Sequence, residues 1–224
     1  MTQIPLLQAP SVAIAGSRER FPVRRIFCVG QNYADHAREM GADPTRQAPF
    51  FFTKPADAVV DSGRQLPFPP RTADLQHEVE LVVALAAGGR DVPTQTATEL
   101  IFGYAVGIDL TRRDLQAEAK KAGRPWDMAK GFDYSAPIGP LVQGMPPAAG
   151  AITLTIDGHL RQSDDLKNMI WSIADIIALL STYIAVAAGD LIFTGTPAGV
   201  GPIQHGERVR GTLIGAEPVE VTFD

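Results

Sequence analysis

Short apolar runs bounded by glycine and proline recur along the chain, and they predict a structure built mainly from β-strands. The runs are rich in β-branched or aromatic residues, which is typical of strands. The expected strands cover residues 11–15, 25–29, 78–86, 104–108, 152–156, 190–194 and 219–223.

Patterns that favour helices are fewer. One helix is expected after Thr111, which would form a capping box with Asp114, and it should end at Gly123. A shorter helix is expected over residues 32–40, ending at Gly41.

One apolar segment, residues 169–189, could be a membrane span or a buried helix. It contains Asp175 and three polar residues at 181–183, and little basic charge flanks it, so a buried helix is the better interpretation. Ser172 is expected to cap this helix together with Asp175, and the helix is expected to run towards Gly189.

These elements indicate a β-rich α+β fold with long, shaped loops, in keeping with 21 glycines and 18 prolines. The length favours one domain over residues 1–224, with residues 1–22 as a short N-terminal segment. The Pro- and Gly-rich stretch 143–151 is interpreted as a connection within that domain.

The composition argues against several classes of protein. With 45% hydrophobic residues, a net charge of −5 and no strongly basic block, the chain indicates a soluble globular protein that does not bind nucleic acid. The single cysteine, Cys28, excludes an intramolecular disulfide, and its apolar neighbours predict a small buried side chain. The first residues lack the basic start of a secretory signal, so we expect a cytoplasmic enzyme that does not enter a membrane.

Two glutamates stand at the head of the strand expected over residues 78–86. Side chains alternate along a strand, so Glu78 and Glu80 share one face, roughly 6 to 7 Å apart at the backbone. At an effective dielectric near 20, two such charges repel by about 2 to 3 kcal/mol. The pair fits a solvent-exposed strand end, where the charges are screened, or a site that holds a positive charge.

Asp109 adds a third carboxylate, at the end of the strand expected over residues 104–108. Three carboxylates without a cysteine cluster form an oxygen-donor set that favours Mg²⁺ or Mn²⁺ over zinc. Alone, an aspartate in this position is more often a turn residue. From the residues themselves, a metal site and an incidental cluster both remain open.

Three further stretches could carry chemistry. His36 and Glu39 could act as a base and its orienting carboxylate, or could form an ordinary surface pair. Lys130 could be functional, although solvated surface lysines are commoner. The turn TGTPAGVGP, which follows the strand at 190–194, could offer backbone N–H groups to an anion or could be a tight turn only.

The motifs G-x-N-Y-A-D-H-x-x-E, K-P, H-E-x-E-L, G-x-D-x-T-x-R-D-x-Q, a Lys-Gly pair and T-G-T-P-x-G-V-G-P, in this order, resemble those of the fumarylacetoacetate hydrolase family. The resemblance runs from about Arg25 to Pro202 and is strongest to the small acylpyruvases, such as bacterial fumarylpyruvate hydrolases. It implies a fold of stacked mixed β-sheets with a few helices, and a homodimer.

By the same resemblance, Glu78, Glu80 and Asp109 would hold one divalent cation per subunit, Mg²⁺ or Mn²⁺. His36 and Glu39 would form the dyad that activates water, on a segment that orders as a lid over the substrate. The protein would then hydrolyse a C–C bond in an acylpyruvate, with fumarylpyruvate as the expected substrate and fumarate and pyruvate as products.

The resemblance also assigns the substrate contacts. Lys130 and Gln116 would stabilise developing oxyanion charge, and Arg113, Thr196 and the backbone of the Gly195 turn would hold the pyruvoyl carboxylate. A 2,4-dioxo acid suits such a site because its carboxylate and adjacent keto oxygen chelate a hard cation. Water activated by the dyad would add to C4, and the C3–C4 bond would break with pyruvate leaving as an enolate.

Two departures from the family pattern bear on specificity. Gln31 stands where relatives commonly have arginine, which puts in question a basic contact to the distal carboxylate of the substrate, and Gln76 stands where many have histidine. The same enolate chemistry would serve an oxaloacetate decarboxylase or a dienedioate isomerase. A non-catalytic relative that binds only a metal or a partner is a third alternative, against which the His36 and Glu39 pair argues.

Overall fold

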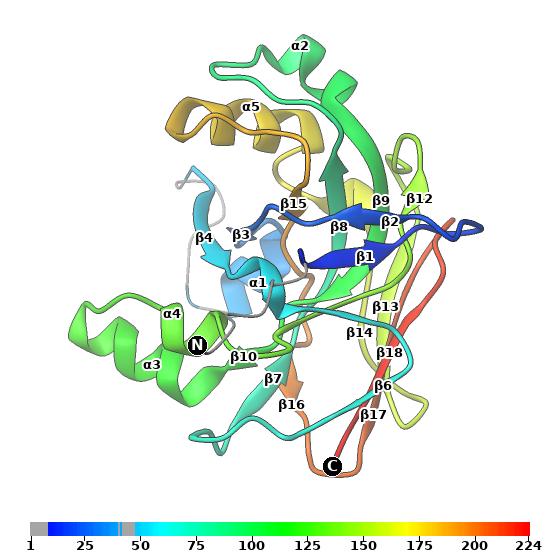
Figure 1. Cartoon of the computed structure of the whole chain (residues 1–224). Coiled ribbons are helices and arrows are strands. Elements are labelled where there is room, and N and C mark those ends of the chain that lie inside the picture. Colours follow the sequence, from blue (N-terminus) through cyan, green and yellow to red (C-terminus); the bar gives the residue numbers. More distant parts are fainter. Residues whose placement is uncertain (1–8, 40, 42–47) are drawn as a thin grey trace, which may run out of the picture.

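Two curled sheets of mixed strand direction form most of the molecule, and a few helices lie around them (Figure 1). The computed structural model describes residues 9–39, 41 and 48–224. Side chains of both sheets meet in one hydrophobic core, which contains Val79 and Leu81 of the larger sheet and Ile152 and Val221 of the smaller. The predicted β-rich fold of stacked mixed sheets is confirmed.

The elements have the following bounds. The eight-stranded sheet runs in the order β4 (Phe50–Lys54), β3 (Arg25–Gly30), β15 (Asp190–Phe193), β8 (Val79–Leu85), β9 (Ile101–Ile108), β11 (Ala136–Ile138) and β5 (Val59–Asp61), with β12 (Val142–Gln143) paired to β9. The five-stranded sheet runs in the order β14 (His159–Asp165), β13 (Ala151–Ile156), β17 (Arg208–Leu213), β18 (Val219–Phe223) and β6 (Arg64–Leu66). Smaller sheets join β10 (Thr111–Arg112), β7 (Leu75–His77) and β16 (Gly201–Pro202), and β1 (Ser11–Ala13) with β2 (Arg20–Pro22). The helices are α1 (Ala34–Glu39), α2 (Thr94–Ala97), α3 (Arg113–Ala122), α4 (Asp127–Lys130) and α5 (Ile173–Tyr183), with 3-10 turns at Ala56–Ala58, Thr98–Leu100 and Leu166–Asn168.

Strand β8 lies between β15 and β9 in the larger sheet, and all seven of its residues are buried. Alternate side chains enter two different cores because they point to opposite faces of the sheet. One face contributes Val79, Leu81, Val83 and Leu85 to the core shared with the smaller sheet, and the other contributes Val82 and Ala84 to a second core. Cys28 is buried in the second core, as predicted.

The apolar segment 169–189 contains α5, as predicted. The hydroxyl of Ser172 accepts a hydrogen bond from the backbone N–H of Asp175, whose carboxylate accepts from the N–H of Ser172, so the expected capping box is present. The helix ends at Tyr183 rather than near Gly189, because the chain becomes extended at the next residue and then pairs with Gly89. Among the described residues, no helix has the length and apolarity needed to cross a membrane.

The capping box predicted at Thr111 is wrong. Thr111 belongs to β10, where it pairs with Gln76 of β7, and α3 begins only at Arg113. The Asp114 carboxylate instead accepts a hydrogen bond from the Thr72 hydroxyl at 2.7 Å. Strand pairing thus overrides the local capping pattern, whereas the end of the helix at a left-handed Gly123 (φ 62°) is as predicted.

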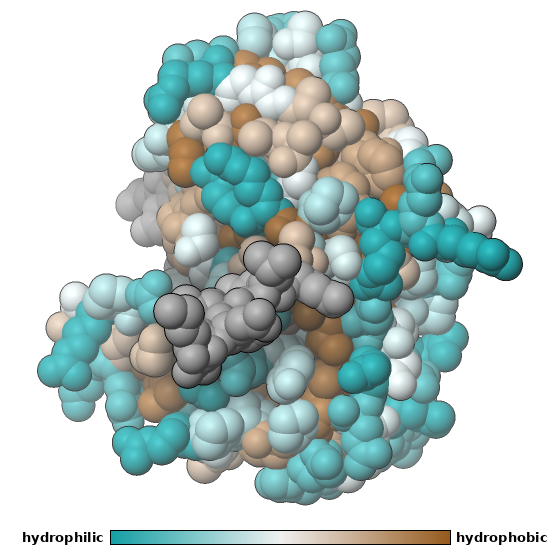
Figure 2. Space-filling view, in the orientation of Figure 1, coloured by the Kyte–Doolittle hydropathy of each residue, from teal (hydrophilic) through white to brown (hydrophobic). Residues whose placement is uncertain are grey.

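Helix α1 lies within the predicted range 32–40, whose last residue, Met40, is outside the described residues. On the face shown in Figure 2, hydrophilic residues predominate over α3, and hydrophobic side chains reach the surface around α5. The side chain of Tyr183, the last residue of α5, is exposed.

Candidate active site

Three carboxylates meet at one end of β8. Glu78 stands between β7 and β8, Glu80 is in β8, and Asp109 directly follows β9. The two strands pair antiparallel, and the Asp109 N–H donates to the Glu78 carbonyl oxygen at 2.8 Å, which places the three side chains together. One oxygen from each lies within 4.8 Å of the others, and all three residues are buried. This carboxylate cluster is therefore no solvent-exposed strand end with screened charges.

Three cations surround the carboxylate cluster, and we call them the inner cations. Lys130 Nζ donates to Glu78 at 2.7 Å and to Asp109 at 2.9 Å, and the Arg113 guanidinium donates to the other oxygen of Glu78. Lys54 Nζ lies 2.8 Å from Asp109 Oδ1. Both lysines are buried. Lys130 is thus no solvated surface lysine, and Lys54 was missed by sequence reasoning, although its place at the end of the run FFFTK marks a lysine in an apolar strand.

The surroundings of the carboxylate cluster shift the pKa values of Glu78 and Glu80 in opposite directions. Burial opposes the charge of Glu78, but Lys130 and Arg113 outweigh it and hold the pKa of Glu78 below its usual range. Burial, with the charges of Asp109 and Glu78, raises the pKa of Glu80 well above its usual range. Burial also acts against the charge of Lys130, but Asp109 and Glu78 raise its pKa.

The carboxylate cluster fits a divalent cation. Asp109 Oδ1 is buried and, within the described residues, accepts no well-aligned hydrogen bond, although Lys54 is close to it. Glu80 has no cationic partner among those residues, and one of its oxygens accepts from the Gly195 N–H at 2.7 Å. A set of buried carboxylate oxygens with spare lone pairs is the donor set that Mg²⁺ and Mn²⁺ prefer.

The predicted dyad lies across the cavity from the cluster. His36 Nδ1 is 3.3 Å from Glu39 Oε2, and the Glu39 carboxylate accepts from the Gly199 N–H at 3.2 Å. His36 is 5% exposed and lines the same cavity as Glu78 and Glu80. Burial lowers the pKa of His36, against the opposing charges of Glu78 and Glu39, so the imidazole is held in its neutral form near pH 7.

Two glutamines fix Arg113. Its Nη1 donates to Gln116 Oε1 and its Nε donates to Gln76 Oε1, both at 2.7 Å. Gln76 therefore helps to orient the arginine that contacts Glu78. Since the oxygen of Gln116 is occupied, and its amide nitrogen has no acceptor in the described part of the chain, that nitrogen is available to a substrate.

The polar groups of the turn after β15 already form hydrogen bonds within the protein. The Gly195 N–H is used by Glu80, and the Thr196 hydroxyl donates to the Val79 carbonyl oxygen at 2.9 Å while accepting from Gln162 at 2.8 Å. Both groups were expected to hold the pyruvoyl carboxylate, and in this arrangement neither has a free hydrogen to donate. Glycine is required at 195, because φ is +97° and a Cβ would lie 2.6 Å from Asn32 Cβ.

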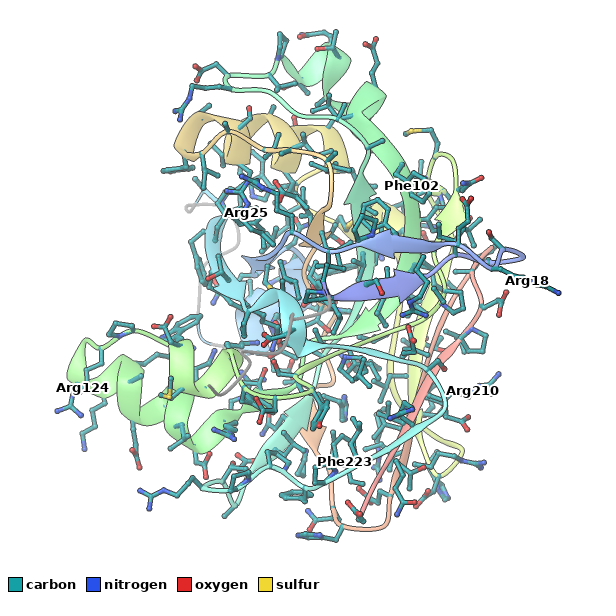
Figure 3. All side chains as sticks on the ribbon, viewed as in Figure 1. Arg18, Arg25, Phe102, Arg124, Arg210 and Phe223 are labelled. Atoms are coloured by element: carbon teal, nitrogen blue, oxygen red, sulfur yellow. The ribbon has the colours of Figure 1, made fainter. Side chains whose placement is uncertain are left out.

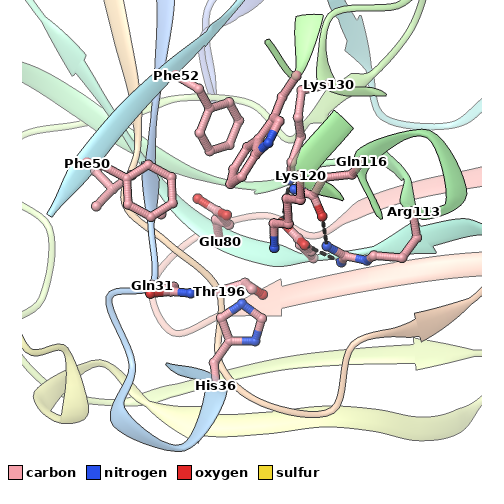
Figure 4. Close-up of a pocket in the computed structure, with 14 residues that line it drawn as sticks. Gln31, His36, Phe50, Phe52, Glu80, Arg113, Gln116, Lys120, Lys130 and Thr196 are labelled. Carbon is pink, nitrogen blue, oxygen red and sulfur yellow. Dashed lines mark hydrogen bonds and ion pairs between the residues drawn. The ribbon is translucent and has the colours of Figure 1, made fainter. Parts of the chain in front are cut away.

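The cavity between the cluster and the dyad has further lining residues that sequence reasoning did not place (Figure 4). The missed side chains with aromatic, amide or charged groups are Phe50, Phe52, Lys120 and Trp126, and Gln31 lines the cavity as well. The aromatic run FFF and the tryptophan of RPWD were the available signals, but their meeting point depends on tertiary structure.

Comparison with known proteins places these features in a family. The family model described as fumarylacetoacetate (FAA) hydrolase C-terminal matches residues 25–223. A fumarylpyruvate hydrolase from a Ralstonia species is 41% identical over 182 residues, which are 80% of this chain and 95% of that protein. An oxaloacetate tautomerase from Escherichia coli is 38% identical over 199 residues, covering 87% and 90% of the two chains.

A solved structure supports the same family. The fumarylpyruvate hydrolase from Pseudomonas aeruginosa, crystallised with Mn²⁺ and pyruvate, superposes with a TM-score of 0.96 at 48% identity and covers 99% of both chains. The sequence motifs, the stacked sheets and these matches agree. The chain belongs to the fumarylacetoacetate hydrolase family.

Proposed function

We propose that the protein is a divalent-metal-dependent hydrolase that cleaves the C–C bond of an acylpyruvate, with fumarylpyruvate as the best candidate. The observation that carries the proposal is the placement of His36, a neutral buried base, on the same cavity as Glu78 and Glu80. The 41% identity to a fumarylpyruvate hydrolase and the Mn²⁺ and pyruvate in a 48% identical structure support this substrate class.

Glu78, Glu80 and Asp109 would hold the metal, Mg²⁺ or Mn²⁺, through their carboxylate oxygens. The ion would supply positive charge for the two chelating oxygens of a 2-oxo acid and for the enolate charge that develops on cleavage.

The chain's own residues perform the proton transfers and the orientation. Glu39 faces Nδ1 of His36, which leaves Nε2 to take a proton from water. The resulting hydroxide adds to C4, the C3–C4 bond breaks, and its electron pair becomes the enolate of pyruvate. His36 returns its proton to C3, which gives pyruvate, and the acyl group leaves as a carboxylic acid that loses its proton to solvent.

Arg113, Gln116 and Lys130 are the groups that face the substrate oxygens in this proposal. Arg113 is fixed by the two glutamines and would hold the pyruvoyl carboxylate. The Thr196 hydroxyl can donate to that carboxylate only if it gives up its hydrogen bond to the Val79 carbonyl oxygen. The amide of Gln116 and the ammonium of Lys130 would stabilise charge on the oxygens of the addition and cleavage steps.

Oxaloacetate tautomerisation is the second candidate, because a relative of similar identity carries that name. A tautomerase moves a proton between carbon and oxygen of a 2-oxo acid and needs no attack by water. Decarboxylation of oxaloacetate and isomerisation of a dienedioate would use the same enolate. Each of these reactions would be served by the same carboxylate cluster.

The test is a substrate panel with purified protein. Pyruvate release from fumarylpyruvate and acetylpyruvate is followed with lactate dehydrogenase, and the enol and keto forms of oxaloacetate are followed by ultraviolet absorbance. We expect pyruvate release that EDTA abolishes and Mg²⁺ or Mn²⁺ restores. Tautomerisation of oxaloacetate with no pyruvate release would establish the second candidate, and no turnover of any compound would favour a binding protein. We also propose a homodimer, which light scattering on the eluting protein tests.

A further inference from the structure

One lysine at the mouth of the cavity has no task in the proposed reaction. Lys120, near the end of α3, lines the cavity together with Glu78 and Glu80 (Figure 4). Its ammonium lies 5.0 Å from the centre of the Trp126 ring. Within the part of the chain that the structure describes, no carboxylate forms an ion pair with it.

The inner cations already face the carboxylate cluster, so the positive charge of Lys120 is not needed to compensate the carboxylates. Arg113 and Lys130 also line the cavity, and both are bonded to Glu78. Lys120 is partly exposed, and its partial burial, followed by repulsion from Arg113, lowers the pKa of its ammonium. An anion placed beside its ammonium would offset both effects.

Three aromatic rings line the cavity that the cluster shares with Lys120. The ring of Trp126 lies 5.5 Å from that of Phe50 and 5.9 Å from that of Phe52, centre to centre. The same three rings line an adjoining cavity of about 420 Å³, whereas the cavity above the cluster has about 30 Å³, room for about two waters. The acyl group of a substrate whose oxo acid end is held at the cluster would therefore extend along these rings, which suit a flat conjugated chain.

We propose that Lys120 binds the far carboxylate of the acyl group, so that the enzyme selects acylpyruvates whose flat acyl chain ends in a carboxylate. This inference rests on the proposed acylpyruvate activity. Gln31, which lines the same cavity, is neutral and supplies at most amide hydrogen bonds there. Lys120 is then the specificity-determining cation for the acyl end, separate from the groups that hold the pyruvoyl end.

Arg124 is the rival cation. It lines the adjoining cavity, which Lys120 does not, and Figure 3 shows it at the outer end of α3, projecting away from the sheets. Lys121 is the matched control, because it is the next residue of α3, is exposed, and lines neither of these two cavities.

The first experiment compares kcat/KM for fumarylpyruvate, which has a distal carboxylate, with that for acetylpyruvate, which has none. We expect Lys120→Met to lower the ratio of the two values about tenfold, mainly through KM for fumarylpyruvate, and Lys120→Arg to keep it. Lys121→Met should leave the ratio as in the wild type. A ratio unchanged in Lys120→Met, or a fall seen in Arg124→Met in its place, would overturn the assignment.

The second experiment needs no turnover. Calorimetry with the Mn²⁺-loaded protein compares 2-oxoheptanedioate with 2-oxoheptanoate, which has the same chain without the distal carboxylate. We expect the wild type to bind the dianion about tenfold more tightly and Lys120→Met to bind both alike. If the wild type hydrolyses neither acylpyruvate yet shows this preference, the proposed function fails and the role of Lys120 stands. A wild type without the preference, or a preference that survives in Lys120→Met, overturns the role of Lys120.

Discussion

Lys54 Nζ lies 2.8 Å from Asp109 Oδ1, and the side chains of both residues are completely buried. The same ammonium donates to the backbone carbonyl of Leu110 at 3.0 Å. A buried ion pair becomes costly when one partner is removed, because the other charge is left without compensation. Lys54 is therefore part of what allows three carboxylates to share a buried site.

Replacing Lys54 with methionine should lower the free energy of unfolding by about 3 kcal/mol in the presence of EDTA. The methionine retains most of the packing of the side chain and removes the charge beside Asp109, together with the hydrogen bonds to the carbonyl oxygens of Leu110 and Lys130. Urea denaturation followed by circular dichroism measures the change, and Lys121→Met, at an exposed position, should stay within about 0.5 kcal/mol of the wild type. Equal stability of the two variants would mean that Asp109 does not depend on the buried ammonium.

A divalent cation should stabilise the fold. At a hundredfold excess over its dissociation constant, a bound ligand adds about 2.7 kcal/mol, which corresponds to roughly 5 to 10 °C in Tm for a chain of this size. Differential scanning fluorimetry with Mn²⁺ and with EDTA measures the shift. Glu80→Gln should abolish the shift while changing Tm little in EDTA, since burial raises the pKa of Glu80 and already favours its neutral form.

Removal of the base should slow catalysis without unfolding the protein. His36→Ala is expected to lower kcat for pyruvate release by about 10²- to 10⁴-fold, the usual contribution of a general base. Binding of Mn²⁺ should be retained, because His36 is not one of the three carboxylates proposed to hold the ion. Hydrolysis at the rate of the wild type would assign the water-activating role to another group.

The pH profile of kcat/KM should have its acid limb below pH 6.5. Burial lowers the pKa of His36 from its ordinary value of 6.5, and only the neutral imidazole can accept a proton from water. Activity is therefore full above the lowered pKa and is lost as the pH falls through it. Glu39 raises the pKa of His36, so Glu39→Gln should move the acid limb further down while it lowers the rate. A limb that moves up would contradict this pairing.

Gln162 is expected to support the site through hydrogen bonds to the residues next to Glu78 and Glu80. Its amide oxygen accepts from His77 Nδ1 at 2.9 Å and from the Val79 N–H at 3.0 Å, and its nitrogen donates to Thr196 and to the Pro197 carbonyl. These bonds join the strand that carries Glu80 to the turn that follows β15.

Gln162→Ala is therefore expected to weaken Mn²⁺ binding roughly tenfold in calorimetry, as is usual when a group that supports metal ligands is lost. The control is Gln143→Ala, at an exposed position in β12. Unchanged Mn²⁺ affinity in a folded Gln162→Ala protein would show that the amide supports stability alone.

Local sequence patterns were sufficient to predict part of the candidate site. Alternation along a strand places Glu78 and Glu80 on one face, and the position of Asp109 after an apolar run places it at the end of the neighbouring strand. Residues three apart on a helix are neighbours, which brings His36 to Glu39. These relationships depend only on backbone geometry within one or two elements.

The remaining contacts join distant parts of the sequence, and no local pattern contains them. Lys54 reaches Asp109 because β4 lies at one edge of the larger sheet and its last residue turns inward towards the cluster. Gln162 reaches Thr196 from the smaller sheet. The capping pattern at Thr111 misled for the same reason, since a partner strand far away in the sequence decided its conformation.

Burial of β8 on both faces has a consequence for how such an enzyme can change. Two of the three carboxylates are attached to, or directly precede, a strand packed into two cores, so a substitution that shifts them also disturbs the folding of the whole sheet. The residues proposed to surround the acyl end come from α3, from the segment before α4 and from the edge strand β4, where the packing constraint is weaker. If the proposed function holds, substitutions at these rim residues can change which acyl chain is accepted without disturbing the strand that carries the carboxylate cluster.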